Sequence, residues 1–96
     1  MTNFHRGEVG LVIDGVERTL CLTLGALAEI ETTLGTSGFA DLAERLKHLS
    51  ASDLVAVLTA LLRGGGEGNA ARELASARLD FADAARAVAD AFERAL

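Results

Sequence analysis

Near the N-terminus, apolar and polar residues alternate with a period of two in the stretches 8–13 and 16–24. The two stretches flank Asp14-Gly15, a dipeptide that tolerates the positive φ angles of a type I′ turn, so they predict a β-hairpin. Its register sets Ile13 opposite Val16, Leu11 opposite Arg18 and Val9 opposite Leu20. A hairpin of two strands is marginal by itself, so we expect helices to cover its apolar face. That face carries Val9, Leu11, Ile13, Val16, Leu20 and Leu22, with Arg18 as the charged exception.

From residue 24 onward the apolar residues recur with a period of about 3.6, which is typical of amphipathic helices. We predict helices over residues 24–34, 38–49, 51–63, 69–78 and 81–96. Thr23, Ser50, Asn69 and Asp80 are candidate N-caps, and Asp53 forms a capping box with Ser50. The expected apolar stripes are Leu24, Leu27, Ile30 and Leu34 in the first helix, Phe39, Leu42, Leu46 and Leu49 in the second, and Phe81, Ala85, Val88, Phe92 and Leu96 in the last.

Three consecutive glycines follow the third predicted helix, and Glu67 and Gly68 come directly after them. Because a glycine run loses too much backbone entropy to stay helical, we predict that it ends the helix and acts as a linker. The predicted fold class is α+β and mostly helical, with an N-terminal β-hairpin and four or five short helices packed in one small domain. Its parts are the hairpin (7–24), three helices (24–63), the glycine-rich linker (64–68) and the C-terminal helices (69–96).

Composition and charge exclude several classes of protein. The chain has 96 residues, enough for one core, and a formal net charge of −5, which disfavours binding to nucleic acid. Its single cysteine excludes an internal disulfide, as is usual in a reducing compartment. The longest apolar run, 54–62, is far shorter than the roughly 20 residues of a membrane span. We therefore expect a cytoplasmic protein that binds neither nucleic acid nor membranes.

The residues that could carry chemistry are few and scattered. The glycine run lacks the Lys-Ser/Thr that completes a phosphate-binding loop, since the one lysine is Lys47. His5 and His48 have no ligand partners at metal-binding spacing, and Cys21 has no nearby base. We expect no catalytic residue, metal or cofactor, and hence no enzyme, unless folding brings Cys21, His48 and Glu44 around one pocket.

The surplus of apolar residues in the third and last predicted helices indicates a binding or assembly role instead. In a small helical domain these apolar residues are either all part of the core, or some of them form a surface for a partner. The candidate partner-binding residues are Leu54, Val57, Leu58, Leu61, Leu62, Val88 and Phe92.

Several segments carry a family resemblance, and their motifs are structural: 6–9, the Asp14-Gly15 turn, 22–35, 52–54 and 61–66. Together they resemble the small tail-cluster protein of bacterial gene transfer agents, a family that is similar to the tail assembly chaperones of long-tailed phages. Some members of that family are labelled phage tail tube protein. The resemblance covers nearly the whole chain and supplies no catalytic residues.

The resemblance implies a role in tail assembly, in which the protein coats the hydrophobic, helical tape-measure protein while tube subunits polymerise around it. A structural subunit of the tail is the alternative, and the resemblance leaves open whether copies of the chain associate with one another. Known tube subunits are β-sandwich-like rings, and one hairpin in 96 residues does not supply such a sheet. We therefore expect a chaperone rather than a tube subunit.

Overall fold

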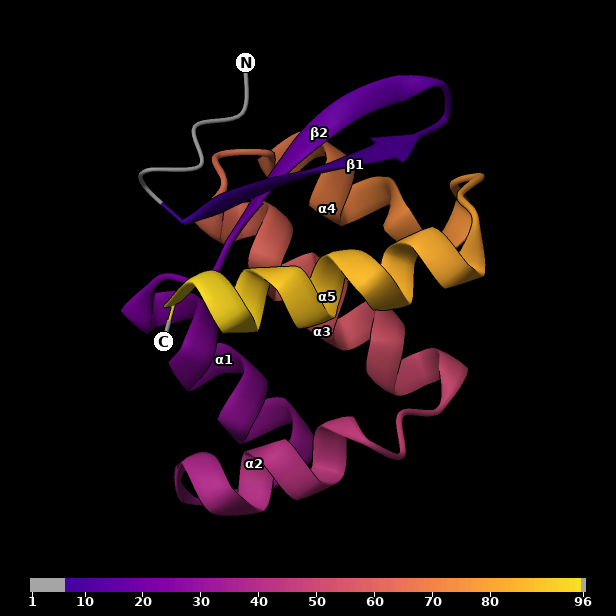
Figure 1. Ribbon diagram of the computed structural model, residues 1–96. Helices are drawn as coiled ribbons and strands as arrows, with labels where there is room; N and C mark the ends of the chain where they lie inside the picture. Colours follow the sequence, from indigo (N-terminus) through magenta and orange to yellow (C-terminus); the bar gives the residue numbers. More distant parts are fainter. Residues whose placement is uncertain (1–6, 96) are drawn as a thin grey trace.

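A two-stranded antiparallel sheet lies across one side of a group of helices in the computed structural model, which describes residues 7–95 (Figure 1). This arrangement confirms the predicted fold class, an N-terminal hairpin followed by helices in one domain. The elements in chain order are β1 (Glu8–Ile13), β2 (Val16–Cys21), α1 (Leu24–Leu34), α2 (Gly38–Leu46), α3 (Ala51–Gly64), α4 (Gly68–Glu73), the 3₁₀ turn η2 (Leu74–Ser76) and α5 (Phe81–Ala95).

The hairpin has the predicted register, with Ile13 opposite Val16, Leu11 opposite Arg18 and Val9 opposite Leu20. Asp14 and Gly15 have φ angles of 53° and 78°, as a type I′ turn requires. On the predicted apolar face, Val9, Leu11, Ile13 and Leu20 are buried against the helices, whereas Val16, beside the turn, is exposed. The turn also docks on the chain before α5, because the Asp14 amide donates to the Arg78 carbonyl and the Arg78 amide donates to the Asp14 carboxylate.

Side-chain caps fix where the helices begin. The Thr23 hydroxyl accepts from the Ala26 amide, and Ser50 and Asp53 form the predicted capping box. Asp80 caps α5 by accepting from the Asp83 amide. The Asp53 carboxylate also pairs with Arg45, and this contact and the hydrogen bond from the Ser50 amide lower the pKa of Asp53 below its ordinary value of 3.8.

Two helices differ from their predicted extent. The second ends at Leu46 rather than Leu49, because the amides of residues 47 and 48 bond to carbonyls only three residues back and tighten the chain into a turn. The predicted helix 69–78 is instead α4 followed by η2, and the residue at its N-terminal boundary is Glu67 rather than Asn69. Glu67 has no side-chain cap bond because its carboxylate faces β2.

Two glycines of the predicted linker 64–68, Gly64 and Gly65, pack against the hairpin. Gly64 belongs to α3, and a Cβ built there would lie 2.1 Å from the Cys21 carbonyl oxygen. A Cβ on Gly65 would lie 2.1 Å from the Thr19 carbonyl oxygen. Real Cβ atoms essentially never come this close to backbone, so these two glycines permit direct contact between the end of α3 and β2.

One core joins the sheet to α1, α3 and α5. In α5 the buried stripe contains the predicted Val88 and Phe92, together with three alanines outside the predicted stripe, Ala84, Ala87 and Ala91. Four predicted stripe residues are instead exposed, namely Leu24, Phe39, Phe81 and Ala85, and Leu96 lies outside the described residues. Leu24, Phe39 and Phe81 are each the first or second residue of their helix.

Candidate functional site

The seven predicted partner-binding residues lie in the interior. Their exposed fractions are 7% or less, and four of them, Val57, Leu58, Leu61 and Leu62, are at 2% or below. The sequence allowed these residues to be core or to form a surface for a partner, and in the structure they are core. A partner cannot reach most of these side chains while the domain is folded, so a binding surface has to be sought among other residues.

One hollow remains on the apolar side of α3. It lies between the first half of α3 and the chain from η2 to the start of α5, and its cavity volume is about 200 Å³. Its rim is formed by Val55 and Phe81, which are 38% and 62% exposed, and two of the predicted residues, Leu54 and Leu58, lie in its floor. We call it the apolar groove; it is lined by Ala51, Leu54, Val55, Leu58, Leu74, Ala75, Ala77, Leu79 and Phe81.

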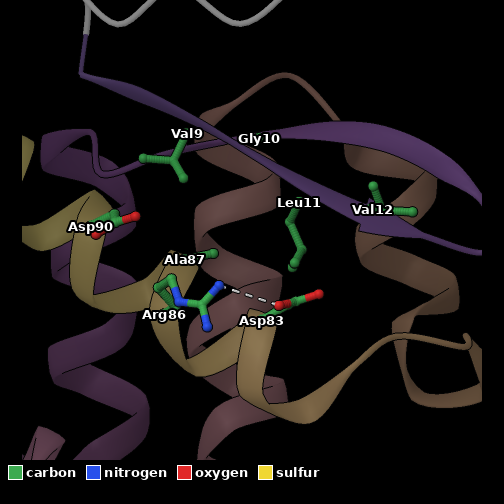
Figure 2. Close-up of a pocket in the computed structure, with 8 residues that line it drawn as sticks. All are labelled: Val9, Gly10, Leu11, Val12, Asp83, Arg86, Ala87 and Asp90. Carbon is green, nitrogen blue, oxygen red and sulfur yellow. Dashed lines mark hydrogen bonds and ion pairs between the residues drawn. The ribbon is translucent and has the colours of Figure 1, made fainter.

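A second hollow follows the outer edge of β1, also with a volume of about 200 Å³. One wall is the strand from Val9 to Val12, and the other is the side of α5 that carries Asp83, Arg86, Ala87 and Asp90 (Figure 2). Figure 2 shows Leu11 pointing from β1 toward α5, with the Arg86–Asp83 ion pair along the helix below. We call this hollow the edge groove.

The two edges of the hairpin differ in what covers them. At the outer edge of β2, the Thr19 amide donates to the Glu67 carboxylate at 2.8 Å, and Arg18 lies 3.5 Å from the same carboxylate. Gly65 packs on the Thr19 carbonyl at the same edge. The outer edge of β1 has the edge groove instead.

A family model described as "Phage tail tube protein, GTA-gp10" matches residues 6–96, which is nearly the whole chain. The chain belongs to this family. Membership confirms the resemblance to gene transfer agent and phage tail proteins and supports a role in the phage tail. No curated protein and no solved structure is similar enough to this chain to be matched.

For this tail protein, the side chains considered for chemistry lie apart. Cys21 ends β2, whereas Glu44 lies in α2 and His48 comes two residues after the end of that helix (Leu46), which lies on the opposite side of the molecule from the hairpin (Figure 1). Glu44 pairs with Lys47, and burial, with a smaller effect of Glu8, raises the pKa of the Cys21 thiol. His5 lies outside the described residues. Within residues 7–95, no group of three or more His, Cys, Asp or Glu side chains is arranged to hold a metal ion.

The described helices are all too short or too polar to cross a lipid bilayer. The apolar groove and the edge groove are the candidate binding surfaces. The sequence patterns predicted neither groove. Phe81 was assigned to the core because it is large and apolar, and nothing in the sequence marks Gly10 or Asp90 as part of a binding surface. The alanines of α5 were the available signal: a stripe through Ala84, Ala87 and Ala91 turns Phe81 outward.

Proposed function

We propose that this protein is a non-enzymatic tail assembly chaperone that acts in the cytoplasm and binds the helical tape-measure protein before the tail tube encloses it. The observation that carries this proposal is the sheet: it has two strands, and the rest of the described chain is helix and loop. A β-sandwich ring needs far more strand than that. A small helical domain suits a transient partner better than it suits a tube wall.

The apolar groove supports the second half of the proposal. A tape-measure protein is a long helix, and its apolar stripe would aggregate if water reached it. Helix-in-groove binding places apolar side chains of one helix into a hydrophobic hollow of the partner. Val55 and Phe81 offer apolar side chains at the surface without being needed to fill the core, and the net charge of −5 keeps such a surface soluble.

The test is co-purification of the tape-measure protein from cells that make the whole tail cluster. We expect Phe81→Asp and Val55→Asp to reduce recovery of the tape-measure protein by about tenfold or more, because a charge in an apolar interface costs well over 1.4 kcal/mol. Both side chains are exposed, so the variants should fold normally.

Leu24→Asp is the matched control. Leu24 is 83% exposed and starts α1, outside the apolar groove, so the same change from an apolar side chain to a carboxylate should leave recovery unchanged. If all three variants recover the tape-measure protein as well as the unaltered chain does, the apolar groove is not its binding site.

A structural subunit of the tail is the second candidate, because the family description itself reads tail tube protein. Quantitative mass spectrometry of purified particles separates the two roles. A chaperone leaves the tail on completion, so we expect this chain to be absent or present in trace amounts. Recovery in a fixed, high ratio to the other tail proteins would establish the structural role and contradict the proposal.

A further inference from the structure

The outer edge of β1 has main-chain groups that no part of the described chain uses. The Thr19 amide points away from β1, because it donates to Glu67. Gly10 lies directly opposite Thr19, so in an antiparallel pair its own amide and carbonyl point away from β2, and those of Val12 do the same. Within residues 7–95 the outward amides and carbonyls of Gly10 and Val12 have no hydrogen-bond partner.

An open strand edge beside a helix is the arrangement that accepts an added strand. In β-augmentation, an extended peptide bonds to the outward main-chain groups, and alternate side chains fill pockets on the neighbouring surface. Here the outward groups of Gly10 and Val12 lie along the edge groove, whose other wall is α5. Ala87, the small residue in that wall, leaves room for a side chain beneath the added strand.

The charges along the groove indicate which strand fits. Arg86 lies 3.4 Å from Asp83 and offsets part of its charge, whereas Asp90 has no ion pair with any of residues 7–95. The chain as a whole is acidic, with a net charge of −5. We propose that the edge groove binds a single extended, basic segment of a partner protein as a third strand beside β1, with a small apolar side chain over Ala87 and a lysine or arginine at Asp90.

A second copy of this chain is a poorer occupant for a geometric reason. Antiparallel pairing of β1 with β1 of another copy would bring the two strands about 4.8 Å apart, with both α5 helices on the same face of the joined sheet. Packed helices need about 8–10 Å between their axes, and each α5 already borders its own β1 edge. Their acidic side chains would also meet. An extended segment without a helix of its own avoids both conflicts.

The probe is a capped seven-residue peptide of alternating valine and threonine with lysine at both ends, titrated into the isotopically labelled 96-residue protein at millimolar concentration. We expect the amide signals of Gly10 and Val12 to shift and their hydrogen exchange to slow. The Thr19 amide should keep its exchange rate, because Glu67 already holds it. The same peptide with prolines in place of threonines keeps the charge but lacks strand-forming amides, and it should not produce these changes.

Charge reversal at one position tests the contact with Asp90. Asp90→Lys should weaken peptide binding about three- to tenfold, the range expected when an exposed ion pair is replaced by repulsion. Glu73→Lys makes the same change at an exposed position of α4, outside the edge groove, and should bind as the unaltered protein does.

Three results would overturn the proposal. The first is a titration that leaves the Gly10 and Val12 amides unchanged. The second is equal binding of the proline peptide, which would reduce the effect to charge attraction. The third is dimerisation in analytical ultracentrifugation that alters the same amides without peptide, which would make a second copy the occupant. None of these results bears on the tape-measure protein, so the proposed function is tested independently of this proposal.

Discussion

At position 65 any side chain would collide with the backbone of β2. The nearest atom to a Cβ there would be the Thr19 carbonyl oxygen at 2.1 Å, followed by the Thr19 carbonyl carbon at 2.6 Å. Neither is the end of a flexible side chain that could move aside. The glycine is therefore required by the packing of β2 on the end of α3, and not by freedom of the chain.

We expect Gly65→Ala to lower the free energy of unfolding by about 3 kcal/mol, the cost of forcing atoms into a closely packed contact. Gly68→Ala is the control, because nothing lies within 4 Å of its Cβ position and Gly68 begins a helix. That variant should be neutral or more stable by up to about 1 kcal/mol. Urea denaturation of both variants measures the difference, and equal midpoints would mean that β2 does not rest on Gly65.

Among the elements, β2 and β1 have different edges because the chain after α3 turns back over only one of them. Glu67 follows the glycines directly and thereby reaches the Thr19 amide from the far side of β2. The ion pair with Arg18 adds little by itself, since the Arg18 side chain is 37% exposed. The main contribution of Glu67 is to give a strand amide an acceptor.

Replacing Glu67 should therefore act on one amide before it acts on the fold. We expect Glu67→Ala to speed hydrogen exchange of the Thr19 amide and to cost about 1–2 kcal/mol of stability, as for a strand donor left without its partner. Glu67→Gln keeps an acceptor oxygen and should lose less. Exchange measured by NMR tests this, and a Thr19 amide that is equally slow in Glu67→Ala would assign its protection to something else.

The whole molecule depends on one cluster of buried side chains shared by the sheet and the helices. Leucine and alanine make up most of it, and aromatic residues contribute only Phe92. A domain of this size is marginally stable, by about 5–15 kcal/mol. No second core exists among the described residues to hold part of the fold if this cluster is disturbed.

Leu61 is fully buried in this cluster, so Leu61→Ala should lower the free energy of unfolding by about 2–5 kcal/mol. Leu24→Ala, at an 83% exposed position, should change it by less than about 0.5 kcal/mol. Thermal unfolding followed by circular dichroism compares the two. A small effect at Leu61 would return that residue to the list of partner-binding candidates.

Local sequence patterns predicted the strands and helices well, because these elements depend on contacts between residues close in the chain. The hairpin register depends on a two-residue turn, and the starts of α1, α3 and α5 depend on a capping residue and the amides within three positions of it. They predicted the surface poorly. Phe81 looks like core because it is large and apolar, but α5 buries alanines instead, since they allow it to lie close against β1.

The sequence by itself therefore determined the fold class, the hairpin register and most helix starts, because each rests on contacts between residues close in the chain. It also carried the membership in a tail protein family. Only the tertiary structure decided that the α3 leucines are interior, that the glycines are a packing contact, and that β1 keeps an open edge. Those outcomes depend on residues some fifty positions apart, such as Thr19 and Glu67, and local spacing holds no information about such pairs.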